Sequence, residues 1–238
     1  MRKRRQAALV IFARLPQAGR VKTRLVPPLT REEALRLHIA CLQSTARLAA
    51  SRPAAIDKWL YLTARSLSQA QRAARQLRLP RALRVRAQRG RGLGGRLARA
   101  FAELRRDGYA RVVVMGSDSP ALDAVRLVQA FHALRRREAV LGPARDGGFY
   151  LIGLSERAPN HGRLFAGIAW GTPQAGRQMR ARLGQYGCRV SLLPAAYDVD
   201  TSADLKRLAR DIKKRRAAHF EPLRHWLAGR ASGAKRPG

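Results

Sequence analysis

The chain has 238 residues, 46% of them hydrophobic, with two cysteines and a formal net charge of +34. This length suits one large α/β domain or two small ones, and the two cysteines make no disulfide framework. No apolar run approaches the length of a membrane span, and the basic-then-apolar N-terminus lacks the small-residue cleavage site of a signal peptide, so we expect a cytoplasmic protein without a membrane span.

Apolar runs typical of strands alternate with amphipathic stretches typical of helices. The patterns predict strands over residues 7–12, 58–63, 83–87, 111–115, 139–142, 149–154 and 189–193. They predict helices over residues 31–50, 66–77, 93–106, 122–136, 172–183 and 202–216. Thr30 and Glu33 form a capping box, and Ser119, Thr172 and Ser202 are the expected N-caps of three later helices.

Strands and helices that alternate with short loops predict a mostly parallel sheet with helices on both faces. We expect one α/β domain over residues 1–216 and a C-terminal extension over residues 217–238, disordered at its Gly-, Ala- and Arg-rich end from residue 228. Ligands of such sheets bind beyond the carboxyl ends of the strands. The loops that follow the strands are therefore where functional residues are expected.

The loop over residues 13–25, ARLPQAGRVKTRL, offers Gly19 and the cations Arg14, Lys22 and Arg24. A flexible glycine with forked arginine groups suits a diphosphate, although the Gly-Lys-Ser/Thr of a P-loop is absent. Lys22 and Arg24 are two residues apart, so an extended loop would point both the same way. A chain this basic would place cations in any loop, so phosphate binding and composition explain this loop equally well.

Acidic residues are rare in this chain, yet Asp118 directly follows a buried strand, and Asp198 and Asp200 precede a helix. A carboxylate at the carboxyl end of a strand can hold Mg²⁺, or it can cap the next helix. Because Ser119 is the better cap, Asp118 is left free. Asp198 and Asp200 share a face in extended chain, where two carboxylates repel unless a cation lies between them. We therefore favour metal binding.

Two glycine-rich stretches allow a structural and a functional interpretation. Residues 88–97, QRGRGLGGRL, precede a helix, whose first amides favour an anion, but they also suit a turn that permits close packing. Residues 146–148, Asp-Gly-Gly, are a plain hairpin turn or a place where backbone approaches a flat ligand, with Asp146 as an acceptor.

Taken together, the stretches FARLPQAGRVKTRL, QRGRGLGGRLARAF, VVVMGSDSPAL, LGPARDGGFYLIGL and YDVDTSADL resemble, in this order, the blocks of one family. It is the bacterial GT-A-like glycosyltransferase family of the arsenosugar-biosynthesis or radical-SAM/selenodomain-associated type. The match covers roughly residues 7–210. It implies a single GT-A-like domain of the nucleotide-diphospho-sugar transferase superfamily.

The resemblance also implies roles for residues on the nucleotide side. Lys22 and Arg24 would hold the diphosphate, with Arg14 nearby and Gly19 shaping the loop. Gly94 and Arg96 would lie near the nucleotide, although the family often has acids where this block has Arg91 and Gly95.

On the catalytic side, Asp118 resembles the acidic position of the family's metal motif, without a second aspartate two residues away. Asp200, with Asp198 beside it, is similar to the later metal-binding aspartate of related nucleotidyltransferases. Asp146 would face the acceptor as a candidate base. The implied cofactor is Mg²⁺ or Mn²⁺.

Three functions follow as hypotheses. The first is a metal-dependent glycosyltransferase that takes a nucleotide-activated sugar and a small-molecule acceptor. The second is a nucleotidyltransferase that takes a nucleoside triphosphate and a phosphorylated acceptor. The third is a nucleic-acid-binding protein that uses the positive charge. Because no single face or arm concentrates the charge, we expect nucleic acid to bind only non-specifically, if at all.

Overall fold

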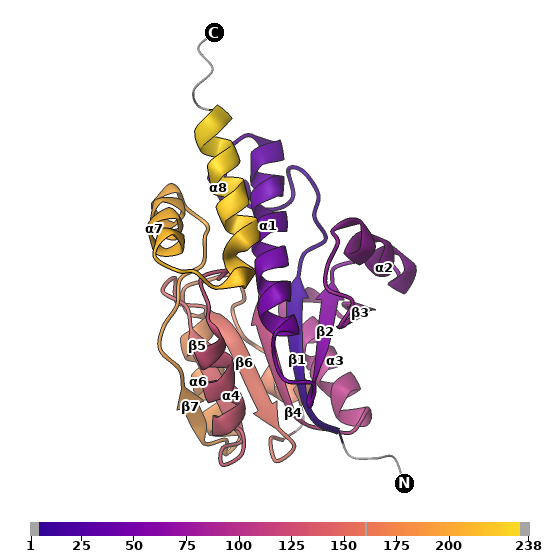
Figure 1. Cartoon of the computed structure of the whole chain (residues 1–238). Coiled ribbons are helices and arrows are strands. Elements are labelled where there is room, and N and C mark those ends of the chain that lie inside the picture. The colour runs from indigo at the N-terminus through magenta and orange to yellow at the C-terminus, as the bar shows by residue number, and fades with distance from the viewer. Residues whose placement is uncertain (1–4, 160, 234–238) are drawn as a thin grey trace.

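The computed structural model describes residues 5–159 and 161–233 (Figure 1). They form one 7-stranded sheet in the order β3-β2-β1-β4-β6-β5-β7. The strands are β1 (Arg5–Ala13), β2 (Ile56–Leu62), β3 (Leu83–Ala87), β4 (Tyr109–Gly116), β5 (Ala139–Pro143), β6 (Phe149–Ser155) and β7 (Val190–Leu192). The predicted α/β fold is confirmed: the pairings are parallel except those that β6 makes with β4 and β5.

The helices follow the strands in the expected alternation. They are η1 (Thr23–Leu25), α1 (Arg31–Ala50), α2 (Leu67–Gln76), α3 (Gly92–Arg106), α4 (Ala124–Ala133), α5 (His161–Leu164), α6 (Ala175–Gln185), α7 (Ser202–Lys213), η2 (Ala218–Phe220) and α8 (Glu221–Gly233). Among the described helices, none is both long and apolar enough to cross a membrane.

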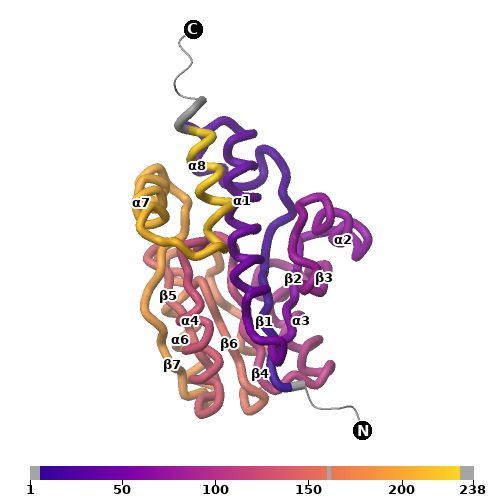
Figure 2. The backbone as a smooth tube through the Cα atoms, viewed as in Figure 1, coloured from indigo at the N-terminus to yellow at the C-terminus, as the bar shows by residue number. Residues whose placement is uncertain are grey.

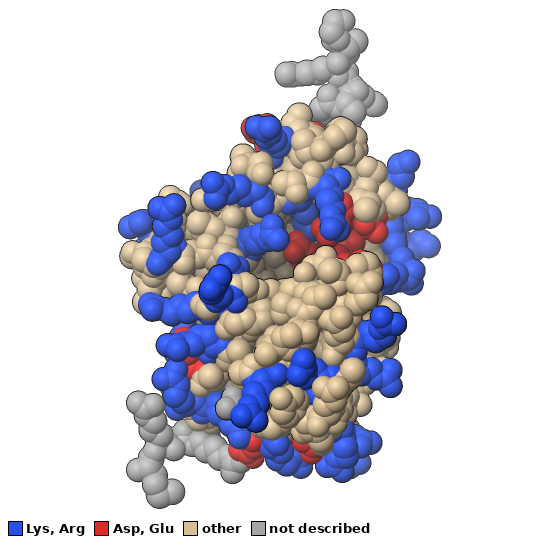
Figure 3. Space-filling view, turned by 180° about the vertical axis from the view of Figure 1, so that it is seen from behind, with Lys and Arg blue, Asp and Glu red and all other residues tan. Residues whose placement is uncertain are grey.

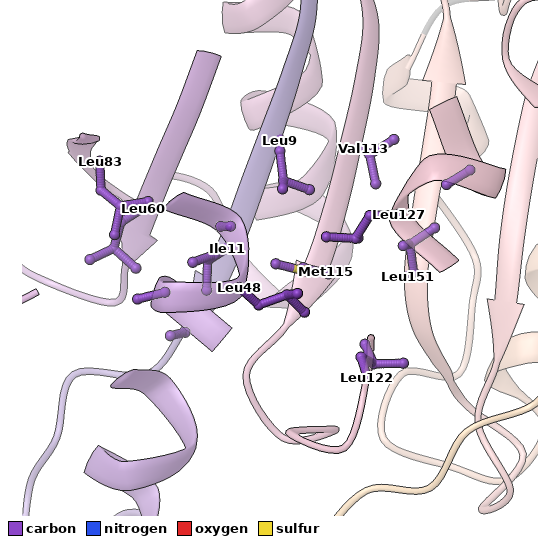
Figure 4. Close-up of a cluster of buried hydrophobic side chains, with 14 of the residues drawn as sticks. Leu9, Ile11, Leu48, Leu60, Leu83, Val113, Met115, Leu122, Leu127 and Leu151 are labelled. Atoms are coloured by element: carbon purple, nitrogen blue, oxygen red, sulfur yellow. The ribbon is translucent and has the colours of Figure 1, made fainter. Parts of the chain in front are cut away.

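The central strand β1 is buried on both faces, as the middle of a parallel sheet requires. Leu9 and Ile11 point into a cluster that α1, α2 and α4 cover, and Figure 4 shows the side chains of this cluster. Ala8 and Val10 point to the opposite face, where α3, α5 and α6 pack. The near-continuous apolar run of β1 thus supplies two cores at once.

A third hydrophobic cluster lies outside these two. It joins the first half of α1 with α7, α8 and the loop after β1, and it includes Leu25, Leu37, Val199, Leu208 and Leu223. Figures 1 and 2 show α1 and α8 side by side, with α7 next to them. The C-terminal extension is therefore packed on the domain, and α8 carries helix as far as Gly233, beyond the residue at which disorder was expected. Residues 234–238 lie outside the described residues.

The predicted capping box at Thr30 is confirmed, but three other N-caps are wrong. The helix expected from residue 172 begins at Ala175, because the Thr172 hydroxyl donates to the carbonyl of Ala169. Helix α7 is capped by Thr201 instead of Ser202, and helix α4 is capped by Asp123 instead of Ser119. The Ser119 hydroxyl is instead engaged with an acid of the candidate site.

Candidate active site at the carboxyl edge of the sheet

The loop after β4 and the segment before α7 meet at the carboxyl edge of the sheet. The loop after β1 starts at the same edge, because Phe12 of β1 is level with Gly116 of β4. The N–H of Val199, in the segment before α7, donates to the carbonyl of Asp118 over 2.9 Å. This bond fixes the segment before α7 against the loop after β4.

The segment before α7 alternates between core and site. Tyr197 and Val199 are 7% and 0% exposed and pack in the third cluster. Asp198 and Asp200 therefore face away from it, as alternate residues of an extended chain do. Burial of Tyr197 and Val199 thus anchors this segment and leaves Asp198 and Asp200 facing the site.

Lys22 lies between the two predicted metal-binding carboxylates. Its Nζ is 2.6 Å from Oδ1 of Asp118 and 3.2 Å from Oδ1 of Asp200, and its side chain is 2% exposed. Burial opposes the positive charge, but the carboxylate of Asp118 prevails, with help from Asp200, and the pKa of Lys22 is raised above its usual value. For Asp118, partial burial likewise opposes ionisation, but the charge of Lys22 prevails and lowers the pKa below its usual value. The structure thus brings Lys22, Asp118 and Asp200 together as a charged triad.

Asp198 is in a different environment from its two acidic neighbours. Its Oδ1 accepts the hydroxyl hydrogen of Ser119. Burial raises the pKa of Asp198 to about 6, against the lowering effect of the Ser119 hydrogen bond. Charges of Asp118 and Asp146 add to the rise. The carboxyl group of Asp198 therefore titrates closer to neutral pH than an ordinary aspartate does, and it lies next to the contact between Lys22 and Asp118.

A cavity of about 390 Å³ opens beside these groups at the carboxyl ends of β1 and β4. Its polar walls include Arg14, Arg96, Asp118 and Asp198, and its apolar walls include Phe12. Figure 3 shows a gathering of Asp and Glu surface at a hollow on a face otherwise dotted with Lys and Arg. The cavity thus offers two arginines and an acidic edge within one space.

The remaining predicted residues lie in varied positions. Gly19 has a φ of 71°, a conformation that favours glycine, and Arg24 is exposed in η1. A Cβ on Gly94 would come within 2.5 Å of Trp170 Nε1, so this glycine permits close packing under α3. Oδ1 of the exposed Asp146 accepts the N–H of Gly148 over 3.0 Å and closes its own turn.

Gln88 also lines the cavity and was not singled out from the sequence. Its Nε2 donates to the carbonyls of Ala13 and Tyr61 over 3.0 and 2.9 Å, which fixes its side-chain amide at the end of β3. The available signal was its place directly after a predicted strand, where ligands of such sheets are expected.

The acidic pair fits a divalent cation of a particular kind. Within residues 5–159 and 161–233, no group of three or more His, Cys, Asp or Glu side chains is arranged to hold a metal. The side chains of Asp118 and Asp200 are 47% and 36% exposed, and each contacts Lys22 through Oδ1. Mg²⁺ typically takes one or two carboxylates and completes its coordination with water and substrate phosphates. The pair therefore suits a cation that binds together with a phosphorylated ligand.

Comparison with known proteins places this geometry in context. A family model described as "Uncharacterized protein conserved in bacteria (DUF2064)" matches residues 45–172. A protein of Desulfovibrio desulfuricans G20, provisionally assigned as a nucleotide-diphospho-sugar transferase, is 30% identical, with 95% of this chain and 96% of that chain covered and a TM-score of 0.84. No curated protein matches the chain.

More distant solved structures share the fold. Rv0371c of Mycobacterium tuberculosis H37Rv is 20% identical, with 87% of this chain and 99% of that chain covered and a TM-score of 0.53. A cytidylyltransferase of Leptospira borgpetersenii serovar Hardjo-bovis is 10% identical, with 99% of both chains covered and a TM-score of 0.55. At these identities the likeness concerns the fold alone.

Proposed function

This chain belongs to the DUF2064 family and is a transferase of the nucleotide-diphospho-sugar transferase fold, and we propose that it transfers a sugar from a nucleotide-activated donor to a small-molecule acceptor. The observation that carries the proposal is the meeting of Asp118 and Asp200 beside a cavity that two arginines line. Diphosphate, metal and sugar then have complementary groups in one place.

In this proposal the cavity takes the nucleotide part of the donor. Arg14 and Arg96 lie on its wall, and guanidinium groups bind phosphate oxygens in pairs of hydrogen bonds. Phe12 offers an apolar surface, and it stacks on Tyr61 with ring centroids 5.7 Å apart. The fixed amide of Gln88 adds a polar contact at the same wall.

Asp118 and Asp200 would hold Mg²⁺ or Mn²⁺ together with the donor's phosphates. A bound divalent cation neutralises the negative charge that develops on the nucleoside diphosphate as it leaves. The protein would orient both carboxylates through two features: the N–H of Val199 donates to the carbonyl of Asp118, and the side chain of Val199 is buried. Lys22 adds a fixed positive charge at the same edge.

Two acids are the candidates for contact with the acceptor. Asp146 is exposed at the turn before β6, and we assign it to the acceptor side, where it would take the proton of the attacking hydroxyl. Asp198 lies on the cavity wall, where its hydrogen bond from Ser119 fixes one carboxylate oxygen.

The groups on the cavity wall favour a sugar nucleotide over a nucleoside triphosphate. Lys22 is engaged with two carboxylates, which leaves Arg14 and Arg96 as the cations that line the cavity. Two guanidinium groups match the charge of a diphosphate better than that of a triphosphate. The face that Figure 3 shows lacks the basic stripe typical of nucleic-acid-binding proteins, because its Lys and Arg side chains are scattered.

A screen of nucleotides tests the proposal. Thermal shift is measured with sugar nucleotides, nucleoside diphosphates and nucleoside triphosphates, each with and without Mn²⁺. We expect stabilisation by a sugar nucleotide and Mn²⁺ together, followed by release of the nucleoside diphosphate in a turnover assay with the same donor. Pyrophosphate release from a triphosphate would instead establish the nucleotidyltransferase.

The matched variants are Asp118→Asn and Asp107→Asn. Asp107 pairs with Arg86 ahead of β4, at the opposite edge of the sheet, so its loss should leave turnover near wild type. Asp118→Asn should lower turnover by about 100-fold or more, a typical loss when one electrostatic group of an active site is removed. Equal turnover of both variants would contradict the site assignment.

A further inference from the structure

We propose that Lys22 is a built-in cation that holds the Asp118–Asp200 pair together in the ligand-free protein and competes with the divalent cation for it. The inference deepens the proposed function and rests on its metal site. It concerns the affinity for the divalent cation. The cation binds weakly to the nucleotide-free protein, and it binds tightly only after phosphates contribute further ligands. The position of the ammonium, between two carboxylates that otherwise suit Mg²⁺ or Mn²⁺, leads to it.

The backbone of Lys22 is held in an uncommon conformation. Its φ is 50° and its ψ is 35°, in the left-handed region that residues other than glycine rarely adopt. Buried Val21 and Leu25 anchor the chain on either side, and the N–H of Leu25 donates to the Lys22 carbonyl over 3.0 Å. Local strain of this kind persists where the surrounding structure determines it, and such residues cluster at functional sites. The fold thus directs this lysine inward instead of leaving it on the loop surface.

The ammonium group of Lys22 offsets the repulsion between the carboxylates of Asp118 and Asp200. Two carboxylates that share a site repel each other unless a cation lies between them. With the Lys22 ammonium in contact with both Oδ1 atoms, Asp118 and Asp200 stay close together without metal. The same contact reduces the charge of the group from −2 to −1, since the lysine contributes +1. A divalent cation therefore meets a weaker attraction and a repelling ammonium a few ångströms away.

A diphosphate changes this balance. Its oxygens supply negative charge and further metal ligands at the edge where Asp118 and Asp200 are partly exposed. Its charge also attracts the ammonium. Metal and nucleotide would then bind together, so that a metal ion without a donor does not occupy the site.

The test measures Mn²⁺ binding to the nucleotide-free protein by electron paramagnetic resonance, which counts free Mn²⁺ directly. Lys22→Met removes the charge and keeps an unbranched apolar stem. The matched control is Lys58→Met, because Lys58 is also buried, at 7% exposure, and its Nζ donates to the carbonyl of Pro53 instead of contacting the acidic pair. We expect Lys22→Met to bind Mn²⁺ at least about tenfold more tightly than the wild type, and Lys58→Met to bind as the wild type does.

Two further variants keep the result decisive. Lys22→Met combined with Asp200→Asn should lose the gain, which places the bound Mn²⁺ at the carboxylate pair. If circular dichroism shows that Lys22→Met is unfolded, Lys22→Gln decides the question by the same measurement. Equal or weaker Mn²⁺ binding without the lysine charge, or an equal gain in Lys58→Met, would overturn the inference. No nucleotide enters the assay, so absence of sugar transfer would overturn the proposed function and leave this result standing.

Discussion

The N–H of Val199 donates to the carbonyl of Asp118, and this bond sets the register in which Asp200 reaches the same lysine as Asp118. The two acids are far apart in the sequence, one just after β4 and the other just before α7. Their approach depends on one backbone contact and on the burial of Val199, not on a contiguous sequence motif. Mutations that probe the site must therefore separate effects on binding from effects on packing.

Arg96 and Arg99 lie one turn apart on α3 and differ in what they face. Arg96 lines the cavity, whereas Arg99 is exposed and its Nε contacts Glu103 Oε1 over 3.1 Å. Arg96→Met should weaken the binding of nucleoside diphosphates by about 10- to 100-fold, because hydrogen bonds between charged groups contribute about 1.5–3 kcal/mol. Arg99→Met should bind as the wild type does in isothermal titration calorimetry. Similar losses in both variants would indicate a general effect of net charge.

Gly94 and Gly95 are neighbours in α3 with opposite surroundings. A methyl group on Gly94 would overlap Trp170 Nε1 and the carbonyl of Phe165, whereas one on Gly95 meets its nearest atom at 3.7 Å. Gly94→Ala should lower the free energy of unfolding by about 1–3 kcal/mol through overpacking. Gly95→Ala should be neutral or stabilising by up to about 1 kcal/mol, since alanine favours a helix. Urea denaturation measures both, and stable Gly94→Ala protein would contradict the packing role.

Thr201 and Ser202 allow an equally close comparison. The Thr201 hydroxyl accepts the N–H of Asp204 over 3.3 Å and completes a capping box, whereas Ser202 is the first residue of α7. Thr201→Ala should lower the free energy of unfolding by about 1 kcal/mol. Ser202→Ala should change it by less than about 0.5 kcal/mol, as expected of exposed positions. Thermal unfolding followed by circular dichroism distinguishes them, and the reverse order would restore Ser202 as the cap.

Glu138 predicts part of the pH dependence of stability. Hydrogen bonds from Arg189 lower the pKa of Glu138 from 4.5 to about 2 in the folded protein. A depressed pKa stabilises the fold above the unfolded value, and that stabilisation is lost as the pH falls from about 4.5 to about 2. Urea denaturation at several pH values in this range should therefore show a smaller acid-induced loss for Glu138→Gln than for the wild type. Parallel pH profiles would exclude this contribution.

The sequence predicted those parts of the structure that depend on local pattern. Apolar runs located the strands of the sheet, and the Thr30–Glu33 pattern located the start of α1. The alternation of Asp198 and Asp200 indicated that both share a face. That Asp200 would reach Asp118 followed from the family resemblance and the rule that loops gather at the carboxyl edge. The roles of these acids stay proposals.

Other features depend on conformation that a single sequence does not encode visibly. Lys22 was expected to reach a diphosphate beside Arg24, because an extended loop would point both side chains the same way. A left-handed turn at Lys22 directs its side chain inward instead, and Arg24 stays exposed. Helix α8 was missed for a simpler reason: the spacing of Phe220, Leu223 and Leu227 is helical, but the composition of the chain end masked it.

The third hydrophobic cluster predicts which parts of the protein unfold together in local, subglobal unfolding. Phe220 and Leu223 at the chain's end share this cluster with Leu25 and Val199, which flank the charged triad. The clusters on the two faces of the sheet are separate from it. Cooperative units of unfolding follow such packing boundaries. The C-terminal helices and both acidic loops should therefore exchange their amide hydrogens together, as one subglobal unit, while the strands beneath them stay protected.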